Sequence, residues 1–150
     1  MAARVVQEVK DTLEQFGPAV LRTKYDEQFS KNPGPTKRLQ AAAGPHKSGN
    51  DPHIAGRALD IVLYATIEAE RVVADKLVEV FLTLREDMRW GGLIYNGSEW
   101  NSRGNKFPRT GTEINRHVTH IHIEWGAKTI DTVNPDNFKQ RFISELMKIS

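Results

Sequence analysis

The sequence His-Ile-His-Ile-Glu-Trp at residues 120–125 alternates between polar and apolar side chains. A period of two favours a β-strand that is buried on one face and polar on the other. His120, His122 and Glu124 then point to one side of this strand, and the isoleucines and the tryptophan point to the other. The fold must therefore cover one face of its sheet with an apolar layer and leave imidazoles on the opposite face.

Three segments with helical periodicity can supply this apolar layer. The first covers residues 3–16 and ends at Gly17–Pro18, and the second covers residues 67–88. The third begins at Asn134, a favourable N-cap residue, which is followed by Pro135 at the first helical position. Their apolar stripes consist of Val5, Val9, Leu13 and Phe16, then Val73, Leu77, Val80, Phe81, Leu84 and Met88, and finally Phe138, Phe142, Leu146 and Ile149.

The remaining segments predict a small sheet joined by long connections. The polar, glycine-containing stretches at 28–52 and 96–116 are expected to form irregular loops. The order of the elements predicts an α+β fold, with a small antiparallel sheet and helices packed on one side. At 150 residues, the chain is expected to form one domain, residues 1–150. Further strands are expected at residues 19–23, 38–43, 57–65 and 93–95.

Charge and composition argue against several classes of protein. The formal net charge is only +2 and the basic residues form local spots, so we expect no nucleic-acid partner. The chain has no cysteine, which rules out disulfides, thiolate zinc ligands and cysteine nucleophiles. The charged N-terminal segment lacks the apolar core of a signal peptide, and no apolar run of about 18 residues is present. We expect a monomer that is made in the cytoplasm and has no membrane segment.

The histidines of the strand raise the question of a metal site. An isolated histidine is more often a surface residue or a hydrogen-bonding partner, and zinc takes at least three protein ligands. Upstream, His53 and Asp60 are separated by six residues, and Asp60 interrupts an otherwise apolar strand. A carboxylate in such a strand needs a partner, because burying an unpaired charge is costly. A metal ion is one such partner, and Arg57 or another cation is the alternative.

The residues around these positions resemble a known family. The string His-x-x-Gly-Arg-Ala-Leu-Asp-Ile, which begins at His53, is followed later by His-Ile-His-Ile-Glu. This combination is similar to the zinc peptidases of the D-Ala-D-Ala carboxypeptidase type. Those enzymes share their fold and metal site with the lysostaphin-type endopeptidases and the hedgehog signalling domain. The resemblance spans roughly residues 46–126 and includes Trp-Gly-Gly at 90–92.

The resemblance implies a hedgehog-like fold in which His53, Asp60 and His122 bind Zn²⁺ as the cofactor. It also implies a metallopeptidase that hydrolyses amide bonds in peptidoglycan stem peptides with a metal-activated water. Such a protein would reach the cell wall after phage-type release or delivery, as an endolysin does. Endopeptidase and D,D- or L,D-carboxypeptidase activities both remain open. The family's Gly-Tyr-Arg-Ser string, whose arginine stabilises the oxyanion, is absent, and Arg22 and Arg38 are open candidates for that role.

The catalytic base is a second point at which the chain departs from the family pattern. Many members carry Glu or Asp three residues before the last metal ligand, where this chain has Thr119. We therefore expect His120, the first histidine of His-x-His, to act as the catalytic base. His117 and Glu113 are further candidates for this role.

Three other interpretations remain open. His-Ile-His also fits the His-hydrophobic-His metal motif of rolling-circle and relaxase nucleases, which use a tyrosine nucleophile. The tyrosines of this chain are Tyr25, Tyr64 and Tyr95. A hedgehog-like binding module would keep the zinc ligands without catalysis. A structural domain that binds no metal is the remaining possibility.

Overall fold

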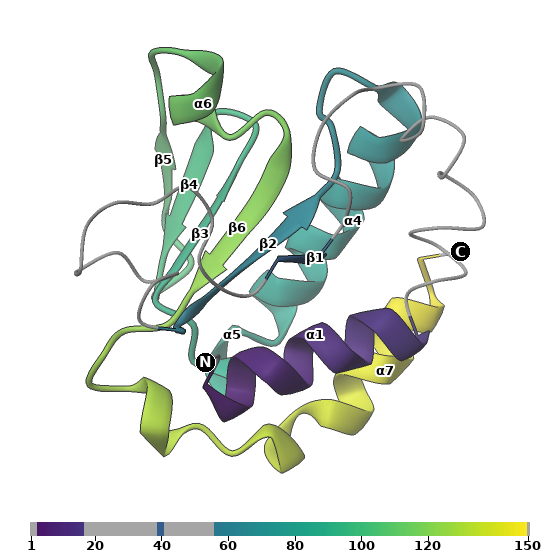
Figure 1. The fold of residues 1–150 in the computed structure, drawn as a ribbon, viewed down its shortest axis with the longest axis vertical. Helices are drawn as coiled ribbons and strands as arrows, with labels where there is room; N and C mark the ends of the chain where they lie inside the picture. Colours follow the sequence, from purple (N-terminus) through teal and green to yellow (C-terminus); the bar gives the residue numbers. More distant parts are fainter. Residues whose placement is uncertain (1–2, 17–38, 41–55, 150) are drawn as a thin grey trace.

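The computed structural model describes residues 3–16, 39–40 and 56–149, and its fold is α+β, as the sequence predicts. At its centre is a six-stranded antiparallel sheet with the strand order β1-β2-β6-β3-β4-β5 (Figure 1). The strands are β1 (Leu39–Gln40), β2 (Ala58–Val62), β3 (Gly92–Tyr95), β4 (Ser98–Asn101), β5 (Lys106–Pro108) and β6 (His120–Glu124).

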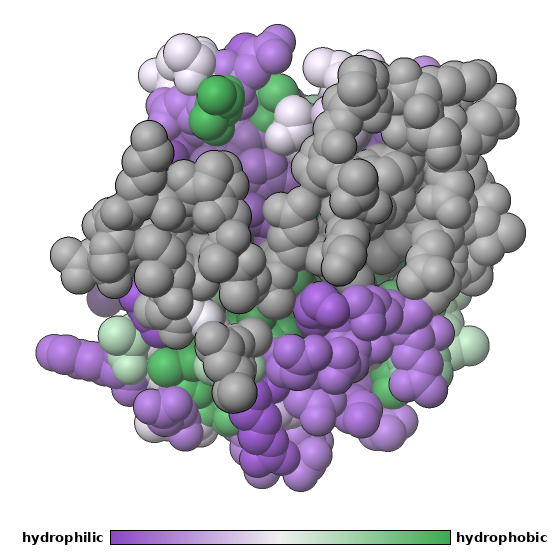
Figure 2. Space-filling model, in the orientation of Figure 1, coloured by the Kyte–Doolittle hydropathy of each residue, from purple (hydrophilic) through white to green (hydrophobic). Residues whose placement is uncertain are grey.

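The long helices share one hydrophobic core with a single face of the sheet, whereas no residue of the short helix Glu113–Arg116 is buried. The helices are α1 (Arg4–Phe16), α4 (Glu68–Thr83), α5 (Arg85–Met88), α6 (Glu113–Arg116) and α7 (Lys139–Met147). The odd-numbered residues of β2, β3 and β6 join the core, among them Leu59, Leu93 and Ile121, together with the buried stripes of α1, α4 and α7. The outward side of α1 is hydrophilic (Figure 2), whereas Val9 and Leu13 of the same helix are fully buried. Burial of one stripe per helix therefore fixes which face of the sheet is covered.

The even-numbered residues of the central strands lie on the opposite face, which carries the side chains of Asp60, His120, His122 and Glu124. The register of β2 and β6 pairs Asp60 with His122, and Ile94 of β3 lies on the other side of His122. The next pair, Ile94 and Glu99, extends this row into β4, and Glu99 pairs with Phe107 of β5. Because paired residues share a face of the sheet, one row of side chains crosses from β2 to β5.

The predicted helix over residues 67–88 is correct in its buried stripe but not in its continuity. All the stripe residues, from Val73 to Met88, are buried. The helix is interrupted at Leu84, whose ψ of 11° lies outside the helical range, and α5 follows. The Trp90 indole nitrogen donates a hydrogen bond to the Phe81 carbonyl, which ties the chain after α5 back to α4.

The prediction of an irregular loop over residues 96–116 was wrong, because this segment contains β4, β5 and α6. Asn96 and Gly97 have positive φ angles of 47° and 80°, and they form the tight turn between β3 and β4. An Asn-Gly pair is the residue choice that such a hairpin turn favours. Strands β4 and β5 lie towards one edge of the sheet and carry mostly polar side chains. They therefore lack the apolar alternation that marks a half-buried strand.

The C-terminal helix also begins later than predicted. The Asn134 side chain accepts a hydrogen bond from the Asp136 backbone N–H, as an N-cap residue should, but the turn it caps is the 3₁₀ helix Pro135–Asn137. A second 3₁₀ helix covers Ile130–Thr132, and α7 starts at Lys139. The predicted stripe of this region is buried throughout.

Some predictions cannot be compared with the structure. The expected strand at 19–23 and nearly all of the connection at 28–52 lie outside the described residues, as do His53, Arg22 and Arg38. The short strand expected within 38–43 is present as β1. Among the described residues, no helix is long and apolar enough to cross a membrane.

Candidate functional site

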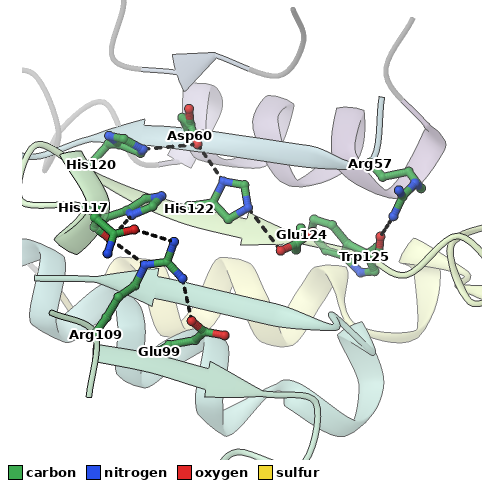
Figure 3. A network of polar contacts seen from close by, with 10 residues as sticks. Arg57, Asp60, Glu99, Arg109, His117, His120, His122, Glu124 and Trp125 are labelled. Atoms are coloured by element: carbon green, nitrogen blue, oxygen red, sulfur yellow. Dashed lines mark hydrogen bonds and ion pairs between the residues drawn. The ribbon is translucent and has the colours of Figure 1, made fainter. Parts of the chain in front are cut away.

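Asp60 and His122 face each other across β2 and β6 on the polar side of the sheet (Figure 3). The Asp60 Oδ1 atom lies 3.1 Å from the His122 Nδ1 atom. Both side chains are largely buried, with 13% of the Asp60 side chain and 9% of the His122 side chain exposed. The carboxylate that interrupts an apolar strand therefore has an imidazole as its partner. The Arg57 guanidinium instead donates a hydrogen bond to the Trp125 carbonyl.

The second ring nitrogen of His122 faces another carboxylate. Its Nε2 atom lies 3.5 Å from the Glu124 Oε1 atom, so the imidazole is held between two acidic side chains (Figure 3). Gly92, the partner of Glu124 on β3, makes room for this arrangement. A Cβ atom at position 92 would lie only 3.2 Å from Glu124 Oε1 and 3.3 Å from its Cγ. The glycine thus allows Glu124 to lie close to the sheet beside His122.

The charges around His122 favour a cation at this place. Burial alone lowers the pKa of an imidazole, but the hydrogen bonds and negative charges of Asp60 and Glu124 outweigh it and raise the pKa of His122 to about 9. In the absence of a metal, the ring is expected to carry a proton on both nitrogens at neutral pH. A metal ion can replace the Nδ1 proton while the Nε2 proton remains with Glu124, as in carboxylate–histidine–metal arrangements.

His120 is the second imidazole near Asp60. Its Nε2 atom lies 3.6 Å from Asp60 Oδ1, and its Nδ1 atom lies 3.0 Å from the Thr119 hydroxyl oxygen. A quarter of its side chain is exposed, compared with less than a tenth for His122. His120 is therefore the more accessible of the two histidines on β6. The Thr119 side chain contacts the ring of its neighbour His120.

His117 completes a cluster of three imidazoles. Its ring centroid lies 4.9 Å from that of His120 and 5.6 Å from that of His122. The residue has a φ of 55°, in the left-handed region, where it ends α6 and turns the chain towards β6. Burial and the neighbouring histidines lower the pKa of His117 to about 4, so its ring is neutral at physiological pH. The structure therefore places His117, one of the alternative candidates for the base, against the other two histidines.

The donor set suits a zinc ion in part. Two ligands on a tetrahedral zinc ion lie about 3.3 Å apart when each bond is about 2.0 Å long. The 3.1 Å between Asp60 Oδ1 and His122 Nδ1 is close to this separation, and imidazole nitrogen and carboxylate oxygen are both zinc ligands. Within residues 3–16 and 56–149, however, no three acidic or histidine side chains are arranged to hold an ion by themselves. Asp60 and His122 thus offer two ligands, and the third candidate, His53, lies outside the described residues.

The remaining candidates occupy different surroundings. Glu113 is an exposed residue of the first turn of α6. Tyr95, one of the possible nucleophiles of the nuclease interpretation, lies in the core on the face opposite to the histidines, and burial raises its pKa. A polar group that the sequence did not reveal lies beside His117 and consists of Arg109, Glu99 and Asn115. Arg109 comes close to His117 because it directly follows β5, a strand that the sequence did not predict.

Comparison of the chain with protein-family models, with curated proteins and with solved structures found no match.

Proposed function

We propose that this chain is a zinc-dependent peptidase that hydrolyses amide bonds in peptidoglycan stem peptides. The observation that carries the proposal is the buried Asp60–His122 pair, in which a carboxylate and an imidazole from adjacent strands face each other at 3.1 Å. The choice of peptidoglycan as substrate comes from the resemblance of the two motifs to cell-wall peptidases.

The two ring nitrogens of His122 face different carboxylates, and this difference assigns the metal ligands. Asp60 Oδ1 and His122 Nδ1 would hold the ion, because His122 Nε2 is turned towards Glu124. His53 would be the third ligand, as the family motif implies. When bound, zinc supplies a Lewis acid and lowers the pKa of a coordinated water to about 7. Glu124 keeps the His122 ring in the orientation that directs Nδ1 to the metal side.

His120 is the residue that we assign to proton transfer. It lies beside Asp60, so it is next to the proposed ion, and its partial exposure leaves the ring open to a substrate. A neutral imidazole in this place can accept the proton of the attacking water and return it to the leaving amine.

Hydrolysis of purified peptidoglycan by the zinc-loaded protein tests the proposal. Wild type should release new amino termini. His120→Ala should retain zinc and lose about 100-fold or more of this activity, as expected for removal of a general base. Arg141→Gln is a suitable control, because Arg141 pairs with Asp87 on the helices. Zinc binding without hydrolysis would contradict the proposal and favour a binding module, and a covalent adduct with single-stranded DNA would favour a nuclease.

A further inference from the structure

Arg109 joins three parts of the chain near the histidines. It follows β5, and its Nη1 atom donates a hydrogen bond of 2.7 Å to the Glu99 carboxylate on β4. Its Nε atom donates to the backbone carbonyl of Asn115, and its Nη2 atom reaches the Asn115 side-chain oxygen at 3.3 Å. Glu99 lies in the same row of side chains as Asp60 and His122, so the guanidinium lies over the polar face of the sheet.

The same Asn115 carbonyl also receives a hydrogen bond from His117. The His117 Nδ1 atom lies 3.2 Å from this oxygen. A carbonyl can only accept, so Nδ1 must carry the proton, and in a neutral ring Nε2 then carries the lone pair. Arg109 and His117 therefore share one acceptor, and Figure 3 shows His117 between Arg109 and the other two imidazoles.

The backbone around His117 depends on the same contacts. The Asn115 side chain donates to the Thr110 carbonyl, and its backbone N–H is capped by the Thr112 hydroxyl. The Arg109 backbone N–H donates to the Gly97 carbonyl, which attaches this segment to the turn between β3 and β4. A four-residue helix is too short to hold its own position. The backbone N–H groups of Asn96 and Gly97 donate to the His117 and Arg116 carbonyls, and the side-chain contacts of Arg109 and Asn115 add to these bonds in fixing α6 on the sheet.

We propose that Arg109 and Glu99 form a positioning pair that orients His117 through the Asn115 carbonyl and keeps it in the Nδ1–H tautomer. The guanidinium fixes the direction of this carbonyl through its own hydrogen bond, and the carbonyl in turn fixes the imidazole. Glu99 holds the guanidinium in place. The Nε2 lone pair of His117 is thereby kept available beside His120 and His122. The expected effect of Arg109 on kcat rests on the proposed hydrolysis, whereas its expected effect on the His117 tautomer does not.

Nitrogen-15 NMR of labelled histidine in the metal-free protein tests the effect on the ring. In wild type, the His117 nitrogens should show one neutral tautomer with the proton on Nδ1. Arg109→Gln should give averaged shifts of two tautomers, and Glu99→Gln, which keeps an oxygen acceptor, should stay closer to wild type. Arg141→Gln removes an arginine of a different ion pair and should leave the His117 signals unchanged. Unchanged His117 signals in folded Arg109→Gln would overturn the proposal.

A second arm separates this proposal from the proposed function. Arg109→Gln should retain zinc, because Asp60 and His122 are intact, and its kcat on peptidoglycan should fall by about tenfold or more with little change in KM. If Arg109→Gln does not fold, Glu99→Ala removes only the support of the guanidinium and is used in both arms. A wild type that shows the single tautomer but no hydrolysis would contradict the proposed function alone. Averaged tautomers in wild type would contradict the positioning pair alone.

Discussion

Glu124 and Gly92 face each other across β6 and β3, and the Glu124 side chain occupies the space that a Cβ atom at position 92 would take. This close approach brings Glu124 Oε1 to within 3.5 Å of His122 Nε2. The orientation of the His122 ring thus depends on Gly92, a residue of a neighbouring strand that has no side chain. The consequence is that a single methyl group on β3 is expected to alter the chemistry of His122.

Gly92→Ala should therefore move Glu124 away from His122. The new Cβ would lie 3.2 Å from Glu124 Oε1, which is too close for the present side-chain position. The pKa of His122 should fall from about 9, and zinc affinity should fall by about 10- to 100-fold as the ring loses its support. An NMR titration of His122 and a competition assay for zinc measure the two effects. Gly126→Ala is the control, because a Cβ there has its nearest neighbour at 3.9 Å, and equal shifts in both variants would contradict the mechanism.

The stability of the metal-free protein should fall as the pH rises from 6.5 towards about 9. The folded pKa of His122 is raised from 6.5 to about 9, so the folded state binds more protons than the unfolded state in this window. The stabilisation is complete below pH 6.5 and is lost at the upper end of the window, by an amount on the order of 3 kcal/mol. Urea unfolding in the presence of a chelator measures it. His122→Gln should flatten the dependence, and an unchanged slope in that variant would assign the effect to other groups.

On the acid side, stability should increase as the pH rises from about 4 to 6.5. Burial and its histidine neighbours lower the folded pKa of His117 from 6.5 to about 4, so the unfolded state binds more protons in this window. His117→Gly should remove this dependence. It should also raise stability at neutral pH by about 1 kcal/mol, because the φ of 55° strains a residue that has a side chain. A His117→Ala protein, which keeps the strain, should show no such gain, and equal midpoints for the two variants would contradict the strain argument.

Phe107 is expected to contribute to substrate binding if the proposed function holds. It is 49% exposed and lies in the row that runs from Asp60 through His122 and Glu99, about 14 Å from His122 at a strand spacing of about 4.8 Å. An extended peptide that crosses the polar face can reach it. Phe107→Ser should raise KM by about three- to tenfold with kcat nearly unchanged. Val72→Ser, at an exposed position of α4, should change neither constant, and a selective loss of kcat in Phe107→Ser would refute a binding role.

Much of the central architecture could be predicted because its signals are local. The alternation of residues 120–125 correctly separated the histidines from Ile121, Ile123 and Trp125, which are fully buried. The helical stripes were correct for the same reason, since each is defined by spacing within one segment. Asp60 stands out in the sequence because a carboxylate is costly in an apolar strand, and the register brings it to His122.

The remainder depends on contacts between distant residues. The strands β4 and β5 carry mostly polar side chains, so turns rather than apolar periodicity set their places in the sheet. Asn96–Gly97 joins β3 to β4, and residues 102–105 join β4 to β5. The link from Arg109 to His117 exists only because this hairpin and α6 lie together on the sheet. The Asn-Gly pair is a sequence signal for the turn between β3 and β4, but no spacing in the sequence reveals the contacts that link Arg109 to His117. The assignment of His53 as a metal ligand stays a prediction of the motif.

Zinc content is the measurement that tests the central claim most directly. Wild type, Asp60→Ala and Asp87→Ala should be purified in the same way, exposed to zinc, dialysed and analysed by inductively coupled plasma mass spectrometry. Asp87 is a matched control, because it also pairs with a cationic side chain but lies on α5. We predict stoichiometric zinc in wild type and in Asp87→Ala, and loss of most of the zinc in Asp60→Ala. Stoichiometric zinc in Asp60→Ala would contradict the assignment of Asp60 and His122 as a metal-binding pair.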